Sequence, residues 1–273
     1  MEHQAVANDW GVVIAAGGGV DSAFAELIGA DTKALAKLGG RPSASYVIDA
    51  CIDAGFGRVV LAAEDRVVER LPRLPPRIEV VKPGTSNIGS IRSAMSKLEH
   101  ERPMIFVPCD SPLISGSHLL HFIERIGERF PNALPDKWFA AGFCGEAEAR
   151  RTHPGADNRG LKFRGGNLAP GGLYAASSGG VEAALAILEE AADNRKSQFK
   201  MVWRFGLLNV ARYFLGTVTP AEAESRVGTI LGGPATIVHD CHPDTTIDFD
   251  TPADWAYLVD HFEARAPAAV PEI

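Results

Sequence analysis

The stretch Val12-Val13-Ile14-Ala15-Ala16-Gly17-Gly18-Gly19 joins an apolar run directly to three glycines. A short apolar run that ends in a glycine turn is typical of a buried strand. Because glycine has no side chain to keep a ligand away, the backbone N–H groups of such a turn can approach phosphate oxygens. We therefore expect a strand followed by a phosphate-binding loop, with a plain tight turn as the alternative. The dinucleotide fingerprint G-x-G-x-x-G is not met, since Ser22 stands at its third glycine position.

Short apolar runs and helical patterns alternate along the rest of the chain, with Gly or Pro at the joints. The predicted strands lie at 10–15, 58–62, 78–81, 104–108, 138–143, 173–176 and 235–238. The predicted helices lie at 43–54, 88–98, 115–130, 181–193, 199–214 and 220–231. Strands and helices that alternate in this way are typical of a parallel sheet covered by helices.

Local signals mark the ends of some helices. Ser43 stands where an N-cap belongs, and Gly55 follows the same helix at the position of a left-handed C-terminal residue. Thr251 is typical of an N-cap, with Pro252 at the first helical position and Asp254 in the first turn. Between 145 and 172 the chain is polar and Gly-rich, and no clean domain boundary is visible. We expect one domain over residues 1–273.

The composition excludes several classes of protein. The 273 residues carry a formal charge of -7 and no run of Lys or Arg, which argues against nucleic acid as a partner. No apolar stretch approaches the roughly 18 residues that span a bilayer, and the N-terminus lacks a signal-peptide pattern. We expect a cytoplasmic protein without membrane insertion. The four cysteines and the histidines His153, His239 and His242 show no metal-binding spacing.

Asp110 follows the apolar run 104–108 in the context Cys109-Asp110-Ser111-Pro112. In open α/β sheets, ligands bind at the carboxyl ends of the strands, so this carboxylate is expected in such a crevice. Magnesium prefers hard oxygen ligands such as carboxylates and phosphates. Asp110 is therefore a candidate metal ligand, and a turn-capping aspartate is the alternative.

A second acidic cluster lies near the C-terminus, in Asp248-Phe249-Asp250-Thr251-Pro252. On a strand, alternation places Asp248 and Asp250 on one face, with Phe249 opposite. Two carboxylates on one face repel unless a cation or solvent compensates them, so a metal site is expected. A solvated strand end beside a helix cap is the alternative.

Taken together, these motifs resemble the MobA-like nucleotidyltransferases. The resemblance is carried by the strand with Ala15-Ala16-Gly17-Gly18-Gly19, by Lys33 in Thr-Lys-Ala-Leu, by Leu38-Gly39-Gly40-Arg41-Pro42, by Asp110 in its D-x-P context, and by the 248–254 motif. It implies a three-layer αβα, Rossmann-like fold of the GT-A type, with a mostly parallel central sheet and a C-terminal helical elaboration around 179–231.

The resemblance also assigns roles to residues. The loop of Ala15, Ala16, Gly17, Gly18 and Gly19 would wrap a nucleoside triphosphate, and Lys33 would contact its phosphates. Asp110 and Asp250 would hold Mg²⁺, with Asp248 as the alternate ligand. The position of residues 83–92 resembles the base-reading loop, which offers Ser86, Asn87 and Ser90. The segment 165–174, preceded by Lys162 and Arg164, would receive an acidic acceptor.

One departure from the family pattern is plain. The family has an arginine after the glycines, whereas this chain has Val20-Asp21-Ser22. Loss of a cation beside a triphosphate weakens charge stabilisation in the transition state. Either another cation replaces it, with Arg41 and Arg92 as candidates, or the enzyme is impaired.

The expected reaction is transfer of a nucleoside monophosphate from a nucleoside triphosphate to a phosphorylated small molecule, with release of pyrophosphate. Its catalytic residues would be Lys33, Asp110 and Asp250. The alternatives are a GT-A glycosyltransferase that uses a nucleotide sugar, an NAD-dependent oxidoreductase, and a nucleotide-binding protein without catalysis. Whether the chain forms a homodimer stays open.

Overall fold

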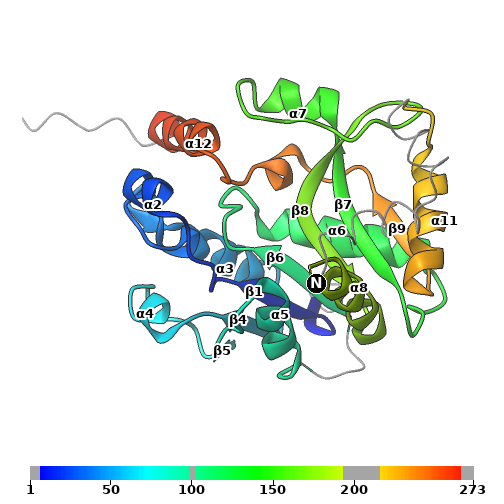
Figure 1. Cartoon of the computed structure of the whole chain (residues 1–273), viewed down its shortest axis with the longest axis horizontal. Coiled ribbons are helices and arrows are strands. Elements are labelled where there is room, and N and C mark those ends of the chain that lie inside the picture. The colour runs from blue at the N-terminus through cyan, green and yellow to red at the C-terminus, as the bar shows by residue number, and fades with distance from the viewer. Residues whose placement is uncertain (1–6, 99–102, 193–215, 266–273) are drawn as a thin grey trace, which may run out of the picture.

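A computed structural model describes residues 7–98, 103–192 and 216–265 (Figure 1). Seven strands form one sheet in the order β5-β4-β1-β6-β8-β7-β9. Their bounds are β1 Gly11–Ala15, β4 Arg58–Ala62, β5 Ile78–Val81, β6 Met104–Pro108, β7 Phe139–Gly145, β8 Leu168–Ala176 and β9 Ala235–Val238. The strands are parallel except β8, which pairs antiparallel with both β6 and β7. The sheet is thus mostly parallel, as expected.

Helices cover both faces of the sheet, and the alternation of β1 side chains shows how. Val12 and Ile14 lie in one buried cluster with residues of α3 (Ser43–Asp53) and α6 (Gly116–Arg129). Val13 points to the opposite cluster, with residues of α5 (Asn87–Met95) and α8 (Ser178–Ala192). An apolar run buried on both faces is what a central parallel strand requires. The fold is a three-layer, Rossmann-like α/β arrangement of the GT-A type.

A third apolar cluster joins the two ends of the described chain. Phe24 and Ile28 of α2 (Ser22–Ile28) pack with Phe249, Trp255 and further residues that lead into α12 (Pro252–Arg265). In Figure 1, α2 and α12 lie next to each other at one end of the molecule. This packing carries the acidic segment 248–250 towards the loop that follows β1.

The remaining elements are short or lie at the periphery of the sheet. They are the 3₁₀ turns η1 (Lys33–Leu35) and η2 (Pro243–Thr246), the two-stranded sheet of β2 (Lys37–Leu38) and β3 (Arg41–Pro42), and the helices α4 (Asp65–Val68), α7 (Glu146–Thr152) and α11 (Pro220–Leu231). Within the described residues, no helix is both long and apolar enough to cross a bilayer.

Several sequence predictions are confirmed to the residue. The strands at 58–62, 78–81, 104–108 and 235–238 and the helix at 220–231 have the predicted bounds. Gly55 adopts a left-handed conformation with φ +84°. The Thr251 hydroxyl accepts a hydrogen bond from the Asp254 N–H at 3.3 Å, as an N-cap does.

Other predictions need correction. Ser43 does not cap α3, because the cap position is Pro42 and the Ser43 hydroxyl instead donates to the Cys109 carbonyl at 2.8 Å. The stretch 145–172 contains α7 and the first part of β8, which periodicity alone did not indicate. Residues 248–250 do not form a strand, although their alternating exposure persists. The predicted helix at 199–214 lies outside the described residues.

Candidate active site

The candidate site lies at the carboxyl ends of β1 and β6. Ala15 pairs with Pro108 in the parallel register, so the loop after β1 and the Cys109-Asp110 turn leave the sheet side by side. Hydrogen bonding with the neighbouring strand extends one residue beyond β1, since the Ala16 N–H donates to the Ala62 carbonyl at 2.9 Å. A Cβ on Gly17 would lie 2.5 Å from Pro83 Cβ, closer than two carbons can approach. Glycine is therefore required at this position by packing as well as by any ligand.

The two ends of the loop between Gly19 and Thr32 are joined, and we call this junction the neck of the loop. Gly19 and Thr32 form an antiparallel bridge, and the Val20 N–H donates to the Asp31 carbonyl at 3.3 Å. Helix α2 fills the loop, with the Asp21 carboxylate accepting from the Phe24 N–H at its first turn. The loop thus returns to the sheet edge, and the next residue in the chain is Lys33.

Lys33 begins η1, where the Thr32 hydroxyl oxygen accepts from the Ala34 N–H at 3.1 Å. The Lys33 ammonium lies 2.7 Å from Asp110 Oδ2 and also pairs with Asp250 Oδ1. Burial alone would lower the pKa of Lys33, but the carboxylates of Asp110 and Asp250 outweigh it and raise that pKa to about 12. The structure therefore brings together the three predicted catalytic residues from separate parts of the chain, with the carboxylates of Asp110 and Asp250 on the Lys33 ammonium.

Asp248 belongs to the same electrostatic cluster. Partial removal from water, together with the negative charges of Asp110 and Asp250, raises the pKa of Asp248 to about 7, although part of its side chain still reaches solvent. Three carboxylates thus share one compensating lysine in this corner of the site. Such an excess of negative charge is stabilised by a divalent cation.

The donor set fits Mg²⁺. Asp110 and Asp250 supply hard carboxylate oxygens, and Asp248 supplies a third beside them. The Asp250 side chain is 71% exposed and that of Asp110 is 16% exposed, so an ion and the phosphates of a substrate can reach both.

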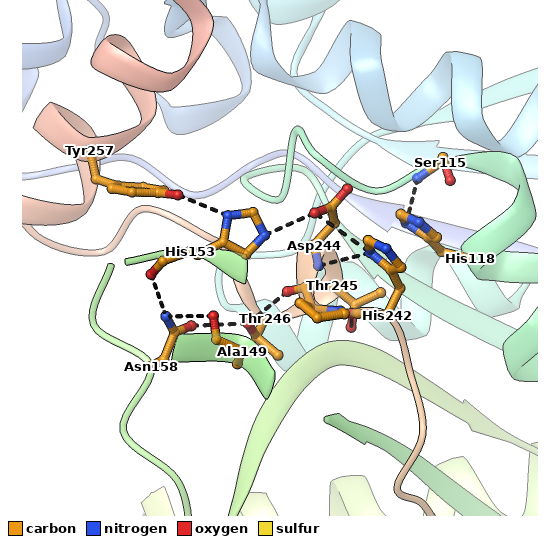
Figure 2. A network of polar contacts seen from close by, with 11 residues as sticks. Ser115, His118, Ala149, His153, Asn158, His242, Asp244, Thr245, Thr246 and Tyr257 are labelled. Atoms are coloured by element: carbon orange, nitrogen blue, oxygen red, sulfur yellow. Dashed lines mark hydrogen bonds and ion pairs between the residues drawn. The ribbon is translucent and has the colours of Figure 1, made fainter. Parts of the chain in front are cut away.

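A buried hydrogen-bond network fixes the segment that precedes the acidic residues (Figure 2). His153, 1% exposed, places Nε2 2.8 Å from Asp244 Oδ1 and Nδ1 2.8 Å from the Tyr257 hydroxyl. Asn158 donates to the His153 carbonyl at 3.1 Å and accepts from the Thr246 hydroxyl at 3.2 Å. These hydrogen bonds hold η2 in place, and Asp248 follows two residues after the end of η2. His153 lies in the bend directly after α7, and it is buried there rather than exposed at the surface.

The same network places His118, His242 and Asp244 close together, with ligand atoms within 4.8 Å of one another. The arrangement does not suit an ion as it stands. Both Nδ1 atoms accept backbone N–H groups, from Ser115 and from Asp244, each at 3.2 Å. The two rings are also stacked, 4.3 Å apart and 11° from parallel, whereas a shared ion must lie near the plane of each ring. This cluster is therefore a stacked pair of imidazoles beside a carboxylate.

Comparison with known proteins agrees with this geometry. The model of the MobA-like NTP transferase domain matches residues 11–154, which is more than half of the chain. The chain belongs to the MobA-like NTP transferase family. The matched range contains the glycine loop, Lys33 and Asp110. No curated protein sequence matches the chain significantly.

Solved structures share the MobA-like fold over nearly their whole length. A hypothetical transferase from Thermus thermophilus is 20% identical, with a TM-score of 0.74 over 89% of this chain and 98% of that one. A nucleotidyl transferase from Methanothermobacter thermautotroptrophicus is 15% identical, with a TM-score of 0.55 over 93% and 98%. A CMP:2-keto-3-deoxy-manno-octonic acid synthetase in complex with CTP is 17% identical, with a TM-score of 0.55 over the same shares. At these identities the likeness shows the fold.

In this MobA-like chain, the residues expected to read the base lie at the start of α5. The Ser86 hydroxyl oxygen accepts from the Gly89 N–H at 3.1 Å, and the Ser90 hydroxyl donates to the Ser86 carbonyl at 3.0 Å. Both hydroxyls thus stabilise the helix start. Asn87 opens the same helix, but its side chain lies outside the described part of the structure. Base recognition by these residues stays a prediction.

The two arginines named as replacements for the missing family arginine are engaged elsewhere. Arg92 pairs with Glu182 at 2.8 Å and with Glu189 at 3.0 Å, both on α8. Arg41 pairs with Asp49 and lies 4.7 Å from the centre of the Tyr46 ring. Each guanidinium therefore joins structural elements in this conformation, and a phosphate contact from either one is untested.

Sequence reasoning overlooked a different arginine. Arg66 lies at the start of α4, just after β4, and pairs with Asp31 at the neck of the glycine loop. It lies beyond the carboxyl end of a strand that neighbours β1, the side of an open α/β sheet where ligands bind. The order of strands in the sheet, on which this placement depends, is visible only in the fold.

Proposed function

We propose that the protein is a Mg²⁺-dependent nucleotidyltransferase that moves a nucleoside monophosphate from a nucleoside triphosphate to a phosphorylated small molecule. The observation that carries the proposal is the Lys33 contact with Asp110 and Asp250 beside the glycine loop. A phosphate-binding turn, a cation and a set of carboxylates are the parts that phosphoryl-type transfer needs, because it depends on positioning and charge neutralisation.

Each part has a distinct role in the proposal. The N–H groups of Gly17 to Gly19 bind the triphosphate, and Lys33 exchanges its carboxylate partners for phosphate oxygens when the nucleotide enters. Asp110 and Asp250, with Asp248 beside them, hold Mg²⁺. When bound, that ion neutralises charge on the triphosphate.

The reaction balances without a covalent enzyme intermediate. An oxygen of the acceptor phosphate attacks the α-phosphorus, the bond from that phosphorus to the bridging oxygen breaks, and pyrophosphate leaves. Asp110 and Asp250 raise the pKa of Lys33 to about 12 before the nucleotide enters, and the phosphate oxygens that then replace them also favour its charged form. Lys33 therefore acts through charge rather than as an acid or base.

The surroundings of β7 and β8 support an anionic acceptor. A cavity of about 650 Å³ lies at the carboxyl end of β7 and is lined by Arg150, Arg164, Asn167 and His239, among others. Two arginines in one cavity favour a phosphate or carboxylate group, and one of them, Arg150, also pairs there with Glu146 at 2.6 Å.

Release of pyrophosphate tests the proposal. The four common triphosphates are combined with a panel of phosphorylated sugars, alcohols and hydroxy acids, with Mg²⁺ or with EDTA. Mg²⁺-dependent pyrophosphate release with one pair of substrates supports the proposal. Tight binding of a triphosphate without release from any pair would instead identify a nucleotide-binding protein, and turnover of a nucleotide sugar would identify a glycosyltransferase.

A further inference from the structure

Arg66 lies where the chain after β4 meets the glycine loop. Its guanidinium pairs with the carboxylates of Asp31 and Glu64, and its side chain is 42% exposed. Arg70, one turn further along, approaches the same Asp31 carboxylate less closely, at 3.8 Å. Of these two arginines, Arg66 therefore makes the close contact with the loop.

Asp31 ties Arg66 to the part of the loop that a triphosphate would contact. The Asp31 carbonyl accepts from the Val20 N–H, and the adjacent Thr32 bridges Gly19. Lys33 follows two residues after Asp31. Asp31 thus lies between the glycine turn and Lys33 along the chain, and Arg66 contacts the loop at this point.

Arg66 also lines a cleft that includes Pro83, a neighbour of the glycine turn. The cleft, of about 510 Å³, is lined by Arg66, Lys82 and Pro83, among others. Pro83 is the residue against which Gly17 packs. Pro83 thus belongs to the cleft and also packs against Gly17, and the acidic residues Glu64 and Asp65 line the cleft beside Arg66.

The negative charge of the loop calls for a cation beside any bound triphosphate. The loop carries Asp21, Glu26 and Asp31, and it lacks the arginine that the family has after its glycines. A triphosphate placed against this loop meets carboxylates unless a cation separates them. A guanidinium suits that task because its planar donors match phosphate oxygens in pairs and it keeps its charge at any physiological pH.

We propose that Arg66 binds the triphosphate in place of the missing loop arginine, and that its ion pair with Asp31 is exchanged for phosphate when the nucleotide enters. This inference rests on the proposed function, because it assumes that a triphosphate occupies the glycine loop. It assigns to the first turn of α4 a group that the resembled family pattern supplies from the loop itself.

Four variants test the inference, and Arg66→Lys is the conservative one. Arg66→Met removes the cation, Arg70→Met removes the arginine in the turn after α4, and Asp31→Asn removes one of the two carboxylates that pair with Arg66, leaving Glu64. Binding of Mg²⁺–tripolyphosphate and of the four Mg²⁺–triphosphates is measured by titration calorimetry. Thermal unfolding of each variant shows that the fold is retained.

We expect Arg66→Met to weaken binding by about 10-fold or more, the range for a lost hydrogen bond to a charged group. Arg70→Met is expected to stay within about 2-fold, and Asp31→Asn to bind as tightly as the wild type or more tightly. Arg66→Lys should recover part of the loss, since it restores charge without the planar pair of donors.

Two results would overturn the inference. If Asp31→Asn weakens binding as much as Arg66→Met does, the arginine serves only to hold the loop. If Arg66→Met binds like the wild type, it does not contact phosphate. A wild-type protein that binds neither tripolyphosphate nor any triphosphate would refute the proposed function itself, which is a separate outcome.

Discussion

The Lys33 ammonium lies 2.7 Å from Asp110 Oδ2, although 77 positions separate the two residues in the chain. The contact joins the end of the glycine loop to the turn after β6, and Asp250 approaches the same ammonium from the C-terminal segment. In this arrangement the lysine compensates carboxylates that would otherwise repel each other. In the proposed reaction, substrate phosphates would take over the ammonium and Mg²⁺ the carboxylates.

Asp110→Asn is expected to reduce Mg²⁺-dependent turnover by at least about 100-fold, because a neutral amide holds the ion and its phosphates poorly. Pyrophosphate release is the measurement, and the unfolding temperature shows that the protein is intact. Asp49→Asn, an exposed carboxylate that pairs with Arg41, is the control and should keep full activity. Undiminished turnover in Asp110→Asn would remove Asp110 from the metal site.

Lys33→Ala is expected to weaken Mg²⁺–triphosphate binding by about 10-fold or more, since it removes a charged donor. Lys37→Ala, four residues further on in β2, should change that affinity by less than about 2-fold because its side chain is exposed. Calorimetric titration of both variants provides the comparison. Equal losses would mean that the phosphates lie elsewhere.

Gly17→Ala is expected to lower the stability of the fold, whereas Gly19→Ala is expected to affect triphosphate binding alone. The new Cβ at Gly17 would clash with Pro83, so the free energy of unfolding should fall by about 1–3 kcal/mol. At Gly19 the nearest atom is the Asp31 carbonyl oxygen at 3.8 Å, so that variant should be as stable as the wild type. It should nevertheless bind triphosphate more weakly if the turn contacts phosphate. Urea unfolding and calorimetry separate the two effects, and a stable Gly17→Ala would contradict the packing argument.

His118 should make the fold less stable as the pH is lowered from 7 to 5, whereas Asp248, with its pKa raised to about 7, contributes in the opposite direction. Burial, followed by the neighbouring His242, lowers the pKa of His118 to about 4, from an ordinary value near 6.5. Between these values the unfolded chain binds more protons than the folded one, so acid favours unfolding. After allowance for solvent screening, the loss due to His118 should be about 1 kcal/mol.

The variant His118→Asn isolates this contribution. Asparagine keeps an acceptor for the Ser115 N–H but does not titrate, so the free energy of unfolding of the variant should fall less from pH 7 to pH 5. Urea unfolding at pH 5 and pH 7 measures the difference. An identical pH dependence in both proteins would assign the effect to other groups.

The comparison of sequence with structure separates local signals from contacts between distant residues. The strands at 58–62 and 104–108 were predictable because they are short, apolar and bounded by turn residues. The prediction that Ser43 caps α3 was wrong, because its hydroxyl donates instead to a buried acceptor 66 residues away, the Cys109 carbonyl. Helix α7, on the polar stretch after β7, carries a weak apolar pattern, and its Ala149 is buried in a small cluster with Cys144 of β7 and Ala169 of β8.

The candidate site divides in the same way. Motif positions identified Lys33, Asp110 and Asp250, but not that one ammonium contacts both carboxylates. The buried role of His153 and the position of Arg66 had no local signal. His153 is buried through partners 91 and 104 positions away, and Arg66 meets a residue 35 positions away.

The sequence by itself determined the order of strands and helices along the chain and the residue types available for phosphate and metal. Those properties are local, because they follow from periodicity, turn chemistry and side-chain charge over a few residues. Only the tertiary structure decided that β8 runs antiparallel between β6 and β7, that α12 packs beside α2, and that Arg66 rather than Arg41 or Arg92 stands at the neck of the glycine loop. These relationships depend on which buried surfaces fit together across the whole sheet, and no short window of sequence contains that information.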